Sequence, residues 1–254
     1  MADTWILLRG LVREQRHWES FPELLRKQNP GKSIITVDVA GNGERFAETS
    51  PASINGLMES VRSRLQETQL PPPYNLIAIS MGAMIGLEWL TEHPEETHKA
   101  VLMNTSLRAF NPFYQRLQPQ SYSVIAKGLF SRQVYNREKS ILDITANLYN
   151  NRAELAEKWA GYYQQHPISK ANAIRQLTAA ARYKAPRHAP HQQVLVLNGA
   201  KDRLVSPECS LNLARNWQLP LRQHPQAGHD LTLDAGDWVA QQIQRFFAPQ
   251  RKRL

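Results

Sequence analysis

Residues 75–84, with the sequence NLIAISMGAM, place a serine between an apolar run and a helix-like stretch. The apolar run ends at Ser80, and small residues, Ala78 and Gly82, lie two positions before and after it. This order predicts a buried strand, a tight turn and a helix, because small neighbours let the strand and the helix approach closely. The turn would set the Ser80 hydroxyl beside a helix N-terminus, whose N–H groups stabilise a developing negative charge. Taken alone, the segment is equally compatible with a serine that caps or packs a helix.

The chain alternates apolar, β-branched runs with helix-like stretches, which is the pattern of an open α/β sheet. The early runs are nearly continuous, as expected for a parallel sheet that is covered on both faces. The predicted strands are residues 5–8, 33–38, 76–79, 100–104, 194–198 and a weaker 220–224. The predicted helices are residues 18–27, 51–67, 83–93, 207–217 and 235–247. We therefore expect a mostly parallel sheet of about six strands with helices on both faces.

The alternation stops between residues 104 and 194, where no strand is evident and 11 of the 21 aromatic residues occur. We predict a helical cap over residues 108–190, inserted into a core formed by residues 1–107 and 191–254. The segment leaves and rejoins the chain between two predicted strands, so we expect it to cover the carboxyl edge of the sheet, where ligands bind in such folds. The alternative is a separate helical domain without a catalytic role.

Length and composition limit the class of protein. The 254 residues suit one large domain or a core with an insertion, and 42% of them are hydrophobic. No apolar run approaches the roughly 20 residues that span a bilayer, and the first residues lack the basic start of a secretory signal. Cys209 is the only cysteine, so no intrachain disulfide can form, and it is expected to be a small packing residue. These features predict a cytoplasmic protein without a membrane span.

The positive charge is concentrated in the predicted cap. The formal net charge is +9, and residues 108–190 contain 13 Lys and Arg but four Asp and Glu, whereas the remainder has 18 of each sign. This distribution favours an anionic, partly apolar substrate, such as an acyl chain on an acidic acyl carrier protein or on coenzyme A. A solvated surface that keeps the protein soluble is the alternative. Nucleic-acid binding is disfavoured because no recognised motif occurs.

Two further residues complete a possible catalytic group. Asp202 follows the predicted strand 194–198, and His229 follows the predicted strand 220–224. The chain order Ser80, Asp202, His229 is one of the known orders of a nucleophile, an orienting acid and a base. Because each residue follows a strand, all three should meet at one edge of the sheet.

Each member of this group has a structural alternative. Asp202 could form a turn, and His229 could satisfy a loop carbonyl. Their rivals are weaker candidates. His224 is expected within a strand and Glu208 within a helix. Asp230 adjoins the base, and adjacent loop side chains usually point apart.

This constellation resembles the α/β-hydrolase superfamily over nearly the whole chain. Residues 37–45, VDVAGNGER, look like that family's D-x-P-G-x-G-x-S loop, and residues 7–12, LLRGLV, match its H-G-x oxyanion loop. The resemblance implies that the backbone N–H groups of Leu11 and Met81 form the oxyanion hole, and that the insertion is the family's helical cap. Within the superfamily, the short single-cap esterases and the pimeloyl-carrier methyl esterases look most similar.

The chain departs from the family pattern at several positions. Ala78 replaces the first glycine of G-x-S-x-G, Ala40 replaces the proline of the loop, and Arg9 replaces the histidine that commonly supports the oxyanion loop. The chain also starts at the strand that holds Trp5, so its sheet should lack the two N-terminal strands of larger members.

The resemblance implies a serine hydrolase that acts on a small-molecule ester or thioester. His229 would take the proton of Ser80, Asp202 would orient the imidazole, and no metal or organic cofactor would be needed. A serine nucleophile argues against dehalogenase and epoxide hydrolase chemistry, for which relatives use aspartate. The hypothesis of a different class is a non-catalytic α/β-hydrolase-fold binding module.

Overall fold

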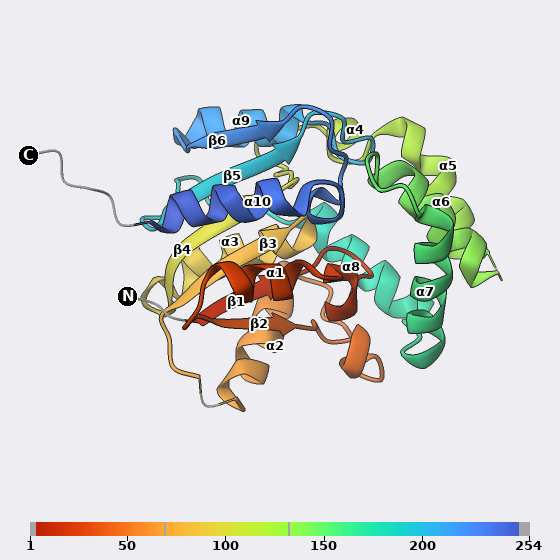
Figure 1. Cartoon of the computed structure of the whole chain (residues 1–254), viewed down its shortest axis with the longest axis horizontal. Coiled ribbons are helices and arrows are strands. Elements are labelled where there is room, and N and C mark those ends of the chain that lie inside the picture. The colour runs from red at the N-terminus through yellow and green to blue at the C-terminus, as the bar shows by residue number, and fades with distance from the viewer. Residues whose placement is uncertain (1–3, 69, 132, 249–254) are drawn as a thin grey trace, which may run out of the picture.

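The computed structural model describes residues 4–68, 70–131 and 133–248, which form a six-stranded sheet with helices on both faces (Figure 1). The strands are β1 (Thr4–Leu8), β2 (Ser33–Val37), β3 (Tyr74–Ile79), β4 (Thr97–Met103), β5 (Gln193–Gly199) and β6 (Leu221–His224). Their order across the sheet is β2-β1-β3-β4-β5-β6, and every neighbouring pair is parallel. The predicted parallel α/β sheet is thereby confirmed.

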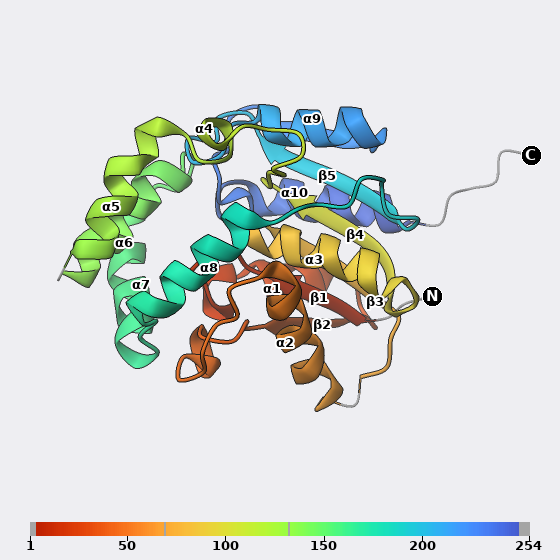
Figure 2. The ribbon, with the colours of Figure 1, turned by 180° about the vertical axis from the view of Figure 1, so that it is seen from behind.

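Alternate residues of β1 enter two separate hydrophobic cores. The helices of this part of the chain are α1 (Phe21–Gln28), α2 (Ile54–Gln66), α3 (Met81–Glu92), α9 (Glu208–Trp217) and α10 (Leu231–Phe247). Ile6 and Leu8 pack with residues of α2, α3 and α9 on one face, which Figure 2 shows toward the viewer. Trp5 and Leu7 pack with α1 and α10 on the other face, which is in front in Figure 1. Burial on both faces explains why these strands are nearly continuously apolar.

Helix starts differ from the sequence prediction where local backbone geometry intervenes. The predicted helix at residues 18–27 is instead a 3-10 turn, η1 (Gln15–Trp18), followed by α1, because Glu19 adopts a φ of 51° between them. Helix α3 begins at Met81, directly after Ser80, two residues before the predicted start. Helix α10 begins at Leu231 and is kinked at Ala235, where φ is −146°.

The segment between β4 and β5 is helical, as the sequence predicted. Its helices are α4 (Phe113–Arg116), α5 (Tyr122–Phe130), α6 (Val134–Thr145), α7 (Arg152–Gln165) and α8 (Lys170–Arg182). They lie beyond the carboxyl ends of the strands, and after α8 the chain runs back along the sheet to the start of β5 (Figure 2). Leu142, Leu155 and Trp159 form part of a small separate core between α6 and α7. Among the described helices, none is both long and apolar enough to cross a bilayer.

Helix α8 docks on two loops of the sheet through a buried polar network. The Gln176 side chain is 0% exposed, and its Oε1 accepts the backbone N–H of Val12 at 3.0 Å. Its Nε2 donates to Asn42 Oδ1 at 2.8 Å and to Ser50 Oγ at 3.0 Å. One turn earlier, Asn172 Oδ1 accepts the backbone N–H of Ser50 at 3.0 Å. The loops after β1 and after β2 are therefore tied to the same helix.

Replacement of Gln176 by leucine should lower the free energy of unfolding by about 2 kcal/mol, because the buried Val12 N–H and Asn42 Oδ1 lose their Gln176 partner and Ser50 Oγ loses one of its hydrogen bonds. Urea unfolding followed by circular dichroism measures the change. Gln164→Leu, at an exposed position on α7, is the matched control and should change stability by less than about 0.5 kcal/mol. Equal effects of the two substitutions would contradict a docking role for Gln176.

Candidate active site

Ser80 occupies a strained turn between β3 and α3. Its φ of 59° and ψ of −122° lie in a region that residues other than glycine rarely adopt. Its backbone N–H donates to the Met103 carbonyl at 2.9 Å, and its own carbonyl accepts the Thr105 hydroxyl at 3.0 Å. One bond to the end of β4 and one to the chain that follows it thus hold the strained residue, which is half-buried at the carboxyl edge of the sheet.

Two glycines allow the backbone after β1 to pack directly against this turn. A Cβ on Gly82 would lie 2.5 Å from the Arg9 carbonyl oxygen and even closer to the carbonyl oxygen of Leu8. A Cβ on Gly10 would lie 3.0 Å from Ser80 Cβ and 3.3 Å from its Oγ. The backbone at Gly10 therefore faces the Ser80 hydroxyl, which is the relation that an oxyanion loop needs to a nucleophile.

Asp202 and His229 are in direct contact. His229 Nδ1 and Asp202 Oδ2 are 2.7 Å apart, and the residues are 7% and 5% exposed. The other carboxylate oxygen, Oδ1, accepts the backbone N–H groups of Leu204 and Val205, both at 2.9 Å. The carboxylate is thereby fixed in orientation, and the Nδ1 contact leaves Nε2 as the ring nitrogen that can exchange a proton with a substrate or a nucleophile.

A residue that the sequence analysis assigned no role, Asn104, joins the loops of the site. Its Nδ2 donates to the carbonyls of Gly228 at 3.1 Å and His229 at 2.6 Å, and its Oδ1 accepts the Gly199 N–H at 2.9 Å. The hydroxyl of the next residue, Thr105, donates a hydrogen bond to the Ser80 carbonyl. Strand β4 lies between β3 and β5, so a residue directly after β4 lies between the loops that follow these two strands. A polar residue at that position was the sequence signal that could have identified Asn104. Asn104 and Thr105 together connect the serine, acid and histidine loops.

The three sequence-predicted residues follow β3, β5 and β6 at the same edge of the sheet. Asp202 and His229 touch, and Ser80 is linked to their loops through the residues after β4. The hydrogen bonds of the described residues include none between the Ser80 hydroxyl and the His229 ring. Catalytic hydrogen bonds are often long without substrate and shorten when it binds.

The two expected oxyanion donors belong to different elements that meet beside Ser80. Met81 is the first residue of α3, and N–H groups in the first turn of a helix have no acceptor within that helix. In the loop after β1, the Val12 N–H donates to Gln176 and the Arg13 N–H to the Gly10 carbonyl. The backbone bonds of the described residues include none donated by Leu11.

The Arg9 side chain supports the loop after β1. Its guanidinium forms a double hydrogen bond with the Asp230 carboxylate, at 3.1 Å and 2.6 Å, and lies 4.9 Å from the centre of the Trp18 ring. Burial acts to raise the pKa of Asp230, but the charge of Arg9, its hydrogen bonds and the charge of Arg13 together hold this pKa below its ordinary value. Asp230 is therefore paired with Arg9, whereas Asp202 is the carboxylate in contact with the His229 ring.

The other rival residues have structural roles. Cys209 is buried in α9, and burial raises the pKa of its thiol to about 12, so the group stays protonated near neutral pH. His224 ends β6, and its Nδ1 accepts the Ala227 N–H at 3.0 Å. Glu208 is the first residue of α9. None of these three takes the place of a member of the predicted group.

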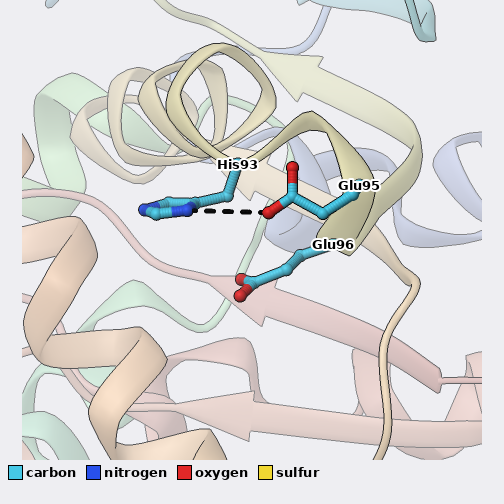
Figure 3. A group of neighbouring side chains, drawn as sticks. All are labelled: His93, Glu95 and Glu96. Atoms are coloured by element: carbon cyan, nitrogen blue, oxygen red, sulfur yellow. Dashed lines mark ion pairs between the residues drawn. The ribbon is translucent and has the colours of Figure 1, made fainter.

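One group of possible metal ligands occurs among the described residues: His93, Glu95 and Glu96, whose donor atoms lie within 4.8 Å of one another (Figure 3). Glu96 already accepts two hydrogen bonds from Arg62, at 2.8 Å and 2.5 Å, and His93 Nε2 is 2.9 Å from a carboxylate oxygen of Glu59. The group precedes β4, at the amino ends of the strands, opposite to Ser80. Because His93 and Glu96 already have protein partners outside the group, we assign it no metal.

Comparison with known proteins gives one family match and many similar folds. The sequence model of the alpha/beta hydrolase family matches residues 5–242. No curated protein sequence matches the chain. The 2-hydroxy-6-oxo-6-phenylhexa-2,4-dienoate hydrolase from Rhodococcus sp. strain RHA1 superposes with a TM-score of 0.80 at 17% identity, covering 97% of this chain and 90% of that one.

Two further structures are similar over nearly the full length. A thermophilic esterase from Thermogutta terrifontis has a TM-score of 0.75 at 18% identity, covering 96% of this chain and 88% of its own. A hydrolase from Pseudomonas aeruginosa has a TM-score of 0.77 at 16% identity, covering 98% and 91%. Identities this low establish a common fold and nothing finer.

Proposed function

The chain belongs to the α/β-hydrolase family, and we propose that it is a serine hydrolase that cleaves a carboxylic ester or thioester through an acyl-enzyme. The observation that carries this proposal is the strained turn at Ser80, at the same sheet edge as the buried contact between Asp202 and His229. Strain of this kind persists only where surrounding structure enforces it, and it clusters at active sites.

In the proposed mechanism, Ser80 Oγ attacks the carbonyl carbon and His229 Nε2 takes the hydroxyl proton. Asp202 holds the ring through Nδ1 and stabilises the imidazolium. The N–H groups of Leu11 and Met81 stabilise the oxyanion, and one such donor contributes about 3–4 kcal/mol to lowering a barrier. The intermediate collapses, the leaving alcohol or thiol takes the proton from His229, and water then attacks the acyl-enzyme to release the acid.

We further propose that residues 108–190 act as the cap and select the substrate. Of this range, the helices α4 to α8 stand beyond the carboxyl ends of the strands, and Gln176 ties α8 to the loop that bears Leu11. The excess of Lys and Arg in these residues favours an anionic acyl substrate, such as one carried on an acyl carrier protein or on coenzyme A. A chemistry of this kind suits a cytoplasmic protein.

A fluorophosphonate probe tests the reaction class. We expect it to label the wild-type protein covalently at Ser80 and to leave Ser80→Ala unlabelled, whereas Ser63→Ala, at an exposed position on α2, should be labelled normally. Mass spectrometry of the labelled peptide gives the position. The absence of labelling in all three proteins would favour a non-catalytic binding module. A panel of p-nitrophenyl esters of rising chain length, run beside acyl thioesters, then defines the acyl and leaving groups.

A further inference from the structure

A buried ion pair lies directly beside the proposed base and joins the two ends of the sheet-forming chain. Arg9 and Asp230 are 221 residues apart in sequence, and both guanidinium Nη atoms bond the carboxylate. Their side chains are 5% and 7% exposed. Such a pair recovers little free energy of folding, because removing both charges from water costs about as much as their attraction returns. Stability alone is therefore a weak reason for this pair to occur here.

The position of the pair gives a better reason. Arg9 adjoins Gly10, whose backbone faces the Ser80 hydroxyl, and Asp230 adjoins His229. The backbone N–H of Asp230 also donates to the last carbonyl of α6, at 2.8 Å. A rigid double hydrogen bond between the two side chains thus fixes the distance between the loop after β1 and the loop after β6. These loops carry the expected oxyanion donor and the expected base.

We propose that Arg9 and Asp230 are positioning residues, whose buried ion pair clamps the His229 loop to the Gly10 loop and so holds the base in register with the oxyanion donors. The inference rests on the proposed function, because it concerns the geometry of that reaction. In this chain the pair supplies the support for the oxyanion loop that the histidine at the equivalent of Arg9 gives in the family.

The pair also balances charge next to His229. Charged and titratable groups in this region of the described structure include Asp202 after β5, Arg9 and Arg13 after β1, His17 in η1 and Asp234 in α10. Burial, followed by the charges of Arg13 and Arg9, holds the pKa of His17 well below its ordinary value, which keeps that ring neutral. Removing one partner of the Arg9–Asp230 pair therefore leaves one unbalanced charge beside the imidazole.

A double-mutant cycle measured by the fluorophosphonate labelling rate between pH 5 and pH 9 tests the proposal. In Arg9→Met, the unpaired carboxylate favours the imidazolium, so the acid limb of the rate profile should move to higher pH by about one unit. In Asp230→Asn, the unpaired guanidinium disfavours the imidazolium, so the limb should move to lower pH. In Arg9→Met with Asp230→Asn, the midpoint should return to the wild-type value, while the rate stays at least about tenfold lower because the clamp is lost.

Two further variants, Arg64→Met and Arg9→Lys, serve as controls. Arg64→Met removes a surface ion pair between Arg64 of α2 and Glu67, the residue after that helix, and should leave both midpoint and rate unchanged. Arg9→Lys keeps the charge without the double hydrogen bond and should keep the midpoint at a reduced rate. Midpoint shifts in the same direction for both single variants, or a double variant as fast as wild type, would overturn the inference.

The design separates this inference from the proposed function and from a folding defect. Wild-type protein that resists the probe would refute the serine hydrolase assignment itself, whereas normal labelling with an unchanged double variant would refute only the clamp. A single variant can fail to fold because it buries an unpaired charge. The double variant buries no net charge, and its labelling rate alone then decides the question.

Discussion

Asp202→Asn should lower kcat/KM for ester hydrolysis by about 10⁴-fold and leave the protein folded. Asp202 Oδ1 accepts the backbone N–H groups of Leu204 and Val205, so in the variant the amide oxygen must occupy that side. The amide nitrogen then faces His229 Nδ1, which is 2.7 Å from the wild-type Oδ2. Because an amide nitrogen only donates, it selects the tautomer whose proton is on Nε2. That ring cannot accept the proton of Ser80.

Initial rates with a p-nitrophenyl ester measure the loss, and circular dichroism with thermal unfolding checks the fold. Asp237→Asn removes the same charge at an exposed position on α10 and should keep wild-type activity. If Asp202→Asn kept more than about a tenth of the wild-type rate, Asp202 would not be the orienting acid. Asp230, which is paired with Arg9, would then have to be tested as the acid.

Gly82→Ala should lower the free energy of unfolding by about 3 kcal/mol and abolish fluorophosphonate labelling of Ser80. The added methyl group would be overpacked against a fixed backbone, which forces α3 away from the loop after β1. The new methyl group would lie 2.5 Å from the Arg9 carbonyl oxygen and even closer to the Leu8 carbonyl oxygen. Neither atom can turn away, because both belong to the backbone at the end of β1. The start of α3 must therefore retreat from the loop after β1, which displaces the turn at Ser80.

Gly161→Ala is the matched control, because a Cβ at this position in α7 meets no atom within 4 Å. Alanine is the better helix former, so this variant should be more stable than wild type by about 0.5–1 kcal/mol. Chemical denaturation of both variants, with probe labelling of the folded fractions, gives the comparison. Wild-type stability and labelling in Gly82→Ala would show that the close approach does not constrain the site.

Local sequence patterns explain which parts of the fold and of the candidate site could be predicted from the sequence. The parallel α/β sheet followed from apolar runs and helical stretches, which are properties of neighbouring residues. Ser80, Asp202 and His229 were identified because each is a reactive residue directly after a predicted strand. The carboxyl ends of parallel strands meet at one edge, so strand position alone brought these three candidates together.

The partners of these residues were decided only by the tertiary structure. Arg9 replaces the histidine that commonly supports the oxyanion loop, yet it bonds Asp230 across 221 positions of the chain. Asn104 bonds His229 across 125 positions, and Gln176 bonds Val12 across 164. Side chains such as these carry no local periodicity, and their bonds form only where packing brings distant loops within about 3 Å. The sequence thus determined the sheet and the order of the reactive residues, whereas folding determined which carboxylate faces the histidine and which polar groups hold the loops in place.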